Sequence, residues 1–191
     1  MYGSCSFHCL FCHGFEDRGA ASSGILAIPL SSASVVLITH VAENAAQLSK
    51  SVTMYTHGNE ELAVQLDPFT NDIFKVERRP IKRLLGESGN TSVTVEFEDG
   101  SKKEESFLVH NPQTTTHGPF VDQLGLSTTP TGDLVVGDGP MVQTSVRGVF
   151  AAGDCMTMYK IMNGALLSGC NAAVMASIQL QAEKYGHESM I

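Results

Sequence analysis

Residues 24–55 restrict the fold of this 191-residue chain more than any other stretch, because two short apolar runs flank a segment with helical periodicity. Residues 24–28 form a short apolar run that Pro29 ends, which indicates a buried strand. Apolar side chains then recur at helical spacing over residues 35–48, and residues 52–55 form a second apolar run. A strand, a helix and a strand in this order form a βαβ unit, so the sequence predicts an α/β fold with a parallel sheet.

The turn between this first strand and the helix lacks the glycines of a dinucleotide-binding unit. Residues 29–34 read Pro-Leu-Ser-Ser-Ala-Ser, although only glycine lets the backbone approach a pyrophosphate closely. Residues 56–58, Thr-His-Gly, offer neither an acid for a ribose hydroxyl nor an arginine for a 2′-phosphate. The serines of the turn are candidate N-caps, and the helix N-terminus could still hold some anion. We expect the architecture of a nucleotide-binding unit without NADPH binding.

Cys9 and Cys12 form a CxxC pair, and His13 follows at once. The pair is compatible with a reversible redox disulfide, with half of a zinc site, and with the CxxCH tether of a c-type haem. In a redox pair the pKa of the more exposed thiol is expected to be lowered, so that its thiolate attacks near neutral pH. His13 would then be a candidate proton carrier. Two structural thiols buried in a turn are a fourth interpretation.

The rest of the chain weighs against the two cofactor tethers. A structural zinc site needs four N or S ligands, and no second CxxC pair exists among the remaining cysteines, which are Cys5, Cys155 and Cys170. A c-type haem would need a mostly helical chain, whereas the residues after His13 predict strands alternating with helices. We therefore expect no metal site and favour the redox disulfide.

Charge and hydropathy exclude two classes of partner. The net charge is −8, the isoelectric point is about 5.3, and no run of Lys or Arg exceeds two residues, which argues against nucleic acid. The basic cluster Arg78, Arg79, Lys82 and Arg83 is most simply a solvated strand face, with a phosphate site as the alternative. No apolar run approaches the roughly 20 residues that span a bilayer, and no signal peptide precedes the first strand, so we expect a cytoplasmic protein without membrane contact. In that reducing compartment a CxxC pair is more often catalytic than structural.

The second half of the chain contains a further informative block. Residues 60–66 predict a short helix, residues 73–109 a β-meander with a turn at 98–101, and residues 111–119 a linker. Residues 149–152 then indicate a buried strand that ends in Gly153 and Asp154, followed by a helix from about 163 to 182. Glycine permits close approach of a ligand, and the aspartate could accept hydrogen bonds from hydroxyls.

These motifs, in this order, resemble those of the thioredoxin-reductase-like flavoproteins of the pyridine nucleotide-disulfide oxidoreductase class. Residues 9–14 read Cys-Leu-Phe-Cys-His-Gly, and residues 148–154 read Gly-Val-Phe-Ala-Ala-Gly-Asp. In that family a CxxC pair lies at the start of an inserted NADPH domain, and a block of the second kind returns the chain to the FAD domain. The resemblance implies a Rossmann-like NADPH-domain remnant, made of the βαβ unit and the β-meander, followed by the C-terminal part of an FAD-binding domain.

The resemblance also implies two groups of site residues. The catalytic group contains the redox pair and a histidine that stands where the reductases usually carry an aspartic acid: Cys9, Cys12 and His13. The FAD-binding group would contact the ribityl chain and, through the start of the last helix, the pyrimidine edge of the flavin: Gly153, Asp154, Lys160, Ile161 and Met162.

Two departures from the reductases are informative. The missing glycine turn and the linker Asn111-Pro112-Gln113-Thr114 are similar to the gliotoxin-type dithiol oxidases of secondary metabolism. Those enzymes form disulfides in dithiol natural products and pass electrons through FAD to O₂ without NADPH. The chain also lacks the N-terminal GxGxxG half that holds the ADP part of FAD, so Met1 is expected to begin a truncated gene model or a fragment.

The sequence thus predicts an FAD-dependent thiol-disulfide oxidoreductase that oxidises a small-molecule dithiol through Cys9 and Cys12, with O₂ as the electron acceptor. An NADPH-dependent disulfide reductase acting on a thioredoxin-like protein is one alternative, and a flavin-free interaction module is another. We expect a redox segment at 1–23, an NADPH-domain-like lobe at 24–110 and the FAD-domain part at 111–191. The resemblance implies a homodimer for the full-length protein.

Overall fold

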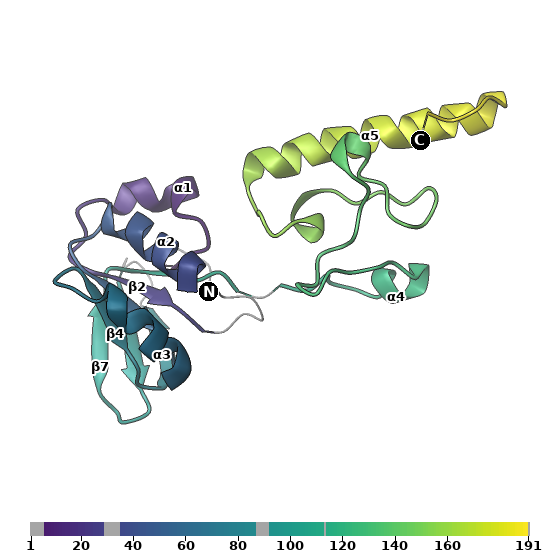
Figure 1. Cartoon of the computed structure of the whole chain (residues 1–191). Coiled ribbons are helices and arrows are strands. Elements are labelled where there is room, and N and C mark those ends of the chain that lie inside the picture. The colour runs from purple at the N-terminus through teal and green to yellow at the C-terminus, as the bar shows by residue number, and fades with distance from the viewer. Residues whose placement is uncertain (1–5, 29–34, 87–91, 113, 191) are drawn as a thin grey trace. The chain divides into compact units, whose positions relative to one another are not determined.

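The computed structural model describes residues 6–28, 35–86, 92–112 and 114–190, and the chain divides into two compact units. Unit 1 is Met1–Pro112 and unit 2 is Gln113–Ile191 (Figure 1). The predicted N-caps in residues 29–34 lie outside the described residues.

Unit 1 contains eight strands and several short helices in the part of the chain that the structure describes. In chain order they are β1 Ser6–Phe7, α1 Leu10–His13, the 3-10 helix η1 Gly14–Asp17, β2 Ser23–Leu26, α2 Val35–Ala46, β3 Val52–Tyr55, α3 Glu60–Leu66, the 3-10 helix η2 Asp67–Phe69, β4 Phe74–Glu77, β5 Ile81–Gly86, β6 Val93–Phe97, β7 Lys102–Glu105 and β8 Phe107–Val109.

Five of these strands form a parallel sheet in the order β1-β8-β2-β3-β4, which confirms the predicted α/β fold. The antiparallel sheet is smaller than predicted, because only β5, β6 and β7 belong to it. The assignment of the whole of residues 73–109 to a meander is therefore wrong. β4 closes a second strand-helix-strand unit after α3, and such crossovers give parallel neighbours. β8 returns to the parallel sheet between β1 and β2.

The parallel sheet is covered on both faces, so its strands alternate between two apolar cores. On one face, side chains of β2, β3 and β8 pack against α2 and α3: Ile25, Met54, Phe107 and Val109 meet Ile38, Ala42, Ala45, Leu62 and Leu66. On the other face the same strands meet the antiparallel sheet: Leu26, Tyr55 and Leu108 pack against Val93, Val95 and Phe97. Gly24 makes room for this second core, since a Cβ there would lie 2.6 Å from the Tyr55 ring.

A buried polar cluster joins the two sheets. The Tyr55 hydroxyl donates to Glu105 Oε1 at 2.5 Å, and Lys103 Nζ lies 3.1 Å from that same oxygen. Lys103 also donates to Thr53 Oγ1 at 2.6 Å. Glu105 is fully buried, and its second oxygen has no hydrogen-bond partner among the described residues. Burial, reinforced by the negative charge of Glu105, raises the pKa of Tyr55 far above its usual value, so this tyrosine stays protonated.

The basic cluster of unit 1 is paired with carboxylates. Arg78 Nη2 lies 2.6 Å from Asp67 Oδ2, and Arg79 Nη2 lies 2.6 Å from Glu77 Oε2. Glu96, which is buried, forms ion pairs with three cations: Lys82, Arg83 and Lys102. These carboxylates already neutralise the cations that the phosphate alternative would require, which favours a solvated strand face.

Unit 2 has little regular structure apart from its last helix. Its described elements are α4 Phe120–Leu124, the 3-10 helices η3 Gly139–Met141 and η4 Gly153–Met156, and α5 Met162–Tyr185. The helix predicted at about 163–182 is confirmed as α5. The strand predicted at 149–152 is wrong, because among the described residues this segment forms only one isolated bridge, between Phe150 and Gln143. A strand needs a continuous ladder of hydrogen bonds to a neighbour.

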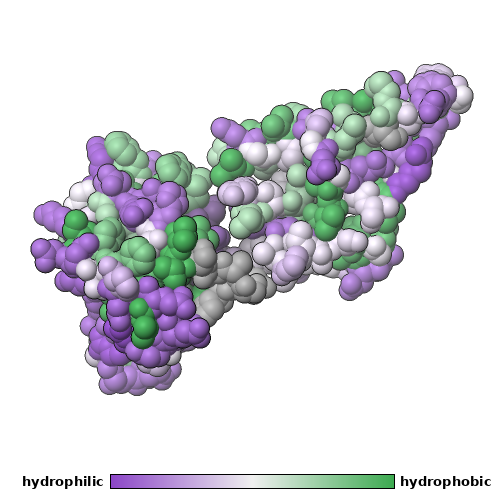
Figure 2. Space-filling view, in the orientation of Figure 1, coloured by the Kyte–Doolittle hydropathy of each residue, from purple (hydrophilic) through white to green (hydrophobic). Residues whose placement is uncertain are grey.

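Apolar side chains are exposed along α5. The largest exposed fractions among its aliphatic residues are those of Met162 at 71%, Leu180 at 65%, and Leu166 and Leu167 at 64% each. Green apolar surface is visible at several places along this helix in Figure 2. No helix in the described ranges is both long and apolar enough to cross a bilayer.

Candidate active site

The CxxC pair lies in the first turn of α1. Cys9 is the N-cap with an extended backbone, and Cys12 lies inside the helix and donates its N–H to Cys9 O at 3.3 Å. The two Sγ atoms are 2.6 Å apart, with the Cys12 thiol donating to Cys9. Cys9 is half-buried and Cys12 is exposed. The pair is thus close enough to close a disulfide and open enough to meet a second thiol.

The segment that carries the thiols is packed against the helical face of the parallel sheet. A Cβ on Gly14 would lie 3.0 Å from Leu48 Cδ1 and 3.1 Å from Leu10 Cδ2, so only glycine fits without displacement. Farther along, the N–H groups of Gly19 and Ala20 donate to Leu48 O at 2.8 and 3.0 Å. These contacts fix both ends of the redox segment to the connection between α2 and β3.

The electrostatics of the pair differ from the prediction. The more exposed thiol, Cys12, has a pKa raised rather than lowered, because it donates a hydrogen bond to Cys9 and is partly desolvated. Cys12 therefore holds its proton more tightly than an ordinary thiol. His13 is exposed, and its imidazole makes no hydrogen bond or ion pair with the described residues. Its role as a proton carrier stays a prediction.

The thiols lie at the carboxyl edge of the parallel sheet, because β1 leads directly into them. His110 follows β8, and its backbone N–H donates to Phe7 O at 2.9 Å. Burial lowers the pKa of its imidazole. A cavity of about 80 Å³ opens at the ends of β2 and β8, where the direction of strand progression reverses, and His8 and Val109 contribute to its wall. In open α/β sheets this crevice is the usual ligand site.

The segment after β3, where a nucleotide-binding domain recognises the ribose, serves an internal purpose here. His57 adopts a left-handed backbone conformation with φ of 49°, and its Nδ1 accepts a hydrogen bond from the Ile81 N–H at 2.9 Å. Gly58 donates its N–H to Arg78 O at 2.8 Å. Both groups thus tie the end of β3 to the chain that leads into β5.

In unit 2, η4 presents the predicted FAD-contacting aspartate. Gly153 has φ of +77° and donates its N–H to Ser168 Oγ of α5 at 2.9 Å, which joins the loop to the helix. The Asp154 side chain is exposed, and its carboxylate has no hydrogen-bond partner among the described residues. At the start of α5, the N-cap Ile161 provides no side-chain hydrogen bond to the first-turn N–H groups. The Asp154 carboxylate can accept hydrogen bonds from a bound molecule, and the first-turn N–H groups of α5 can donate to one.

The side chain of Lys160 binds the loop that precedes α5. Its Nζ lies 3.2 Å from Asp133 Oδ1 and donates to the carbonyl oxygens of Asp154 at 2.7 Å and Thr157 at 2.9 Å. Asp133 is itself held by the Thr131 hydroxyl at 2.7 Å. This network fixes the loop between η4 and α5. The sequence analysis missed Asp133 and Ser168, although the turn Thr-Pro-Thr-Gly-Asp at 129–133 was a signal for a hydrogen-bonded loop.

The chain is similar to curated proteins over most of its length. The chain is 39% identical over 198 residues to a thioredoxin reductase of Gibberella zeae, covering 93% of this chain and 53% of the relative. It is 42% identical over 177 residues to thioredoxin reductase aclD of Aspergillus oryzae, covering 91% of this chain and 55% of the relative. The chain belongs to the thioredoxin-reductase-like family. No family model matches it. It spans a little more than half the length of these curated relatives.

Solved structures share the fold of this chain over most of its length. TrxB of Bacillus anthracis superposes with a TM-score of 0.73 at 22% identity, covering 94% of this chain and 57% of TrxB. HlmI superposes with a TM-score of 0.67 at 21% identity, covering 94% of this chain and 53% of HlmI. At this identity the likeness supports the fold.

Proposed function

We propose that this thioredoxin-reductase-like chain carries the thiol-disulfide exchange site of an FAD-dependent oxidoreductase that oxidises a small-molecule dithiol to its disulfide. The observation that carries the proposal is the 2.6 Å separation of the Cys9 and Cys12 sulfur atoms at an open edge of the sheet. An exchange-competent pair needs both this proximity and access for the attacking thiolate.

The exchange has two balanced steps. A substrate thiolate attacks one sulfur of the oxidised Cys9–Cys12 pair, forming a mixed disulfide and releasing the other cysteine as a thiolate. The second substrate thiol, once deprotonated, attacks the substrate sulfur of the mixed disulfide, which yields the cyclic product and the reduced pair. The two substrate protons end on the cysteines, and the hydrogen bond from Cys12 to Cys9 holds one of them. His13, one residue beyond Cys12, is our candidate for carrying the other.

The residues of unit 2 fit an FAD on three counts. Asp154 has an exposed, unpartnered carboxylate within the described residues, Gly153 offers no side chain, and the first N–H groups of α5 are uncapped. Gly153 and Asp154 would hold the ribityl chain, and Lys160, Ile161 and Met162 the pyrimidine edge. A bound FAD would supply the capacity to take two electrons from the reduced pair and deliver them to O₂.

The internal contacts of His57 and Arg78 support oxidation of a dithiol over NADPH-dependent reduction of a thioredoxin-like protein. His57 Nδ1 is bonded to the Ile81 N–H, and Arg78 is paired with Asp67, so neither side chain is poised for a ribose phosphate. The sequence of residues 29–34 also lacks glycine.

The alternative of a flavin-free interaction module predicts instead that Cys9 and Cys12 do not alternate between the oxidised and the reduced state. We place the activity in the cytoplasm, and in a homodimer of the longer protein, by analogy with the family.

Alkylation mapping tests the redox pair directly. The purified chain is labelled with iodoacetamide before and after mild reduction with dithiothreitol, and peptides are quantified by mass spectrometry. Cys9 and Cys12 should be protected after oxidation and labelled after reduction, whereas Cys155 and Cys170 should be labelled alike in both states. Equal labelling of Cys9 and Cys12 in the two states would remove the basis of the proposal.

A second experiment separates the oxidase from the reductase. In a preparation loaded with FAD, the absorbance of the oxidised flavin is followed anaerobically after mixing with a dithiol or with NADPH. We expect bleaching by the dithiol, its loss in Cys12→Ser, and recovery on admission of O₂. Rapid stoichiometric bleaching by NADPH would instead favour the reductase.

A further inference from the structure

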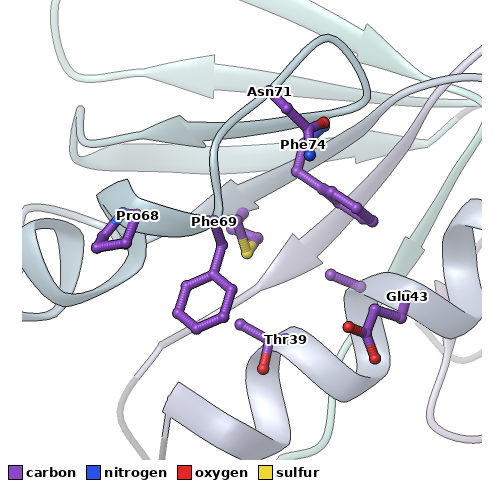
Figure 3. Close-up of a pocket in the computed structure, with 8 residues that line it drawn as sticks. Thr39, Glu43, Pro68, Phe69, Asn71 and Phe74 are labelled. Carbon is purple, nitrogen blue, oxygen red and sulfur yellow. The ribbon is translucent and has the colours of Figure 1, made fainter.

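A cavity of about 270 Å³ lies between α2 and the segment that connects η2 to β4 (Figure 3). Helix α2 contributes Thr39, Ala42 and Glu43, which share one face because they are three and four residues apart. Phe69 and Phe74 contribute the facing wall. The cavity is on the β3–β4 side of the sheet, whereas the redox pair follows β1 at the opposite edge. It is therefore separate from the thiol site.

Hydrogen bonds hold the wall of the cavity in shape. Asn71 Oδ1 accepts from the N–H groups of Ile73 at 2.8 Å and Phe74 at 3.0 Å. The Thr70 hydroxyl donates to Asp67 O at 2.7 Å and closes the turn of η2. These bonds fix the backbone on either side of Phe69. The hollow is thus built by an ordered turn rather than by a loosely packed loop.

The lining is apolar and aromatic with one charge at its rim. Figure 3 shows the Phe69 and Phe74 rings on one side and Thr39 and Glu43 on α2. Met54 of β3 forms part of the floor, and Phe69 is 44% exposed. Such a surface, an apolar floor with aromatic walls and a few polar groups, is typical of small-molecule sites, although the cavity volume of about 270 Å³ lies just below the usual range of roughly 300–1,000 Å³.

The single charged side chain of the lining, Glu43, selects the charge of the ligand. Glu43 is exposed and forms no ion pair with the described residues. The Thr39 hydroxyl already donates to Val35 O at 2.9 Å, so it retains only acceptor capacity toward the cavity. A carboxylate beside aromatic rings attracts a cation through both an ion pair and cation–π contact. An anionic ligand would meet Glu43 with no cation in the lining to offset it.

We propose that this cavity is a binding site for a small organic cation composed of one aromatic or compact apolar group and an ammonium. The apolar group would lie over Met54 between Phe69 and Phe74, and the ammonium would pair with Glu43 at the rim. The site is independent of the redox chemistry.

The experiment uses the whole 191-residue chain with ¹³C-labelled methionine methyl groups and 2-phenylethylammonium as the probe. Of the eight methionines, Met54 lines the cavity, so the other methyl groups serve as internal references. We expect a saturable shift of the Met54 methyl resonance, assigned through Met54→Leu. The neutral 2-phenylethanol should bind several-fold more weakly, and 3-phenylpropionate more weakly still.

Matched charge variants identify the ion pair. Glu43→Gln should weaken 2-phenylethylammonium binding about fivefold and leave 2-phenylethanol unchanged, as expected for an exposed ion pair. Glu104→Gln, which removes an exposed negative charge on β7, should change neither. Phe69→Leu should weaken both probes. A Met54 methyl that does not shift, equal binding of the cation and the anion, or equal effects of Glu43→Gln and Glu104→Gln would each overturn the proposal.

Discussion

Removing the Tyr55 hydroxyl should destabilise unit 1 by about 2 kcal/mol. The hydroxyl donates to the fully buried Glu105 at 2.5 Å, and a hydrogen bond to a charged group contributes about 1.5–3 kcal/mol. Lys103 remains 3.1 Å from the same carboxylate in Tyr55→Phe, so Glu105 is not left as an isolated charge. The cost should therefore stay below the roughly 3–5 kcal/mol of a broken buried ion pair.

Urea unfolding followed by far-ultraviolet circular dichroism measures this loss. With a slope of about 1–1.5 kcal/mol per molar urea for a unit of this size, the midpoint should fall by about 1–2 M. Tyr185→Phe is the matched control, because Tyr185 is 68% exposed on α5 and should change stability by less than about 0.5 kcal/mol. Equal midpoints for Tyr55→Phe and Tyr185→Phe would refute the reasoning, because the buried hydrogen bond would then contribute nothing.

Three further predictions follow from individual contacts. Burial raises the pKa of Tyr55 above its ordinary 10.0, so the unfolded state loses that proton first and stability should fall by about 1.4 kcal/mol per pH unit above pH 10, a slope absent from Tyr55→Phe in urea titrations at alkaline pH. Gly24→Ala places a methyl group 2.6 Å from the Tyr55 ring and should cost about 1–3 kcal/mol, whereas Gly169→Ala, with nothing within 4 Å in α5, should stabilise by about 0.5–1 kcal/mol in the same unfolding assay. Lys160→Met removes the ion pair with Asp133 and two carbonyl contacts, so amide hydrogen exchange should accelerate about tenfold or more at residues 154–161 and remain unchanged in unit 1.

Local periodicity was sufficient where an element is long or has clear ends. It predicted α2 and α3, the strands β2 and β3, and the long α5 within a few residues. It was insufficient for β4 and β8, which it assigned to the antiparallel meander although both belong to the parallel sheet. The periodicity of a strand does not distinguish a parallel from an antiparallel neighbour. The strand predicted at residues 149–152 was wrong for a related reason, since an apolar run indicates burial but does not show that a strand partner exists.

The predictability of the site follows the same division. The spacing of Cys9 and Cys12 is local, so the sequence was enough to bring the two thiols together. The partners that fix the surrounding geometry are distant in the chain: Asp133 lies 27 residues from Lys160, and Glu105 lies 50 residues from Tyr55. Such pairs depend on the completed sheet and loops, which single-sequence patterns do not encode. The raised pKa of Cys12 likewise depends on which thiol donates to the other.

The position of β8 determines when β1 joins the sheet during synthesis. In the described residues β1 has only β8 as a strand neighbour, with Phe7 opposite Val109. About one hundred residues must therefore leave the ribosome before β1 can pair, and closing such a loop makes this pairing slow relative to local contacts. A disulfide between Cys9 and Cys12 would need no such closure, because the two thiols are three residues apart. A nascent chain can thus complete its redox pair before it completes its sheet, which protects these two thiols from pairing with the later cysteines.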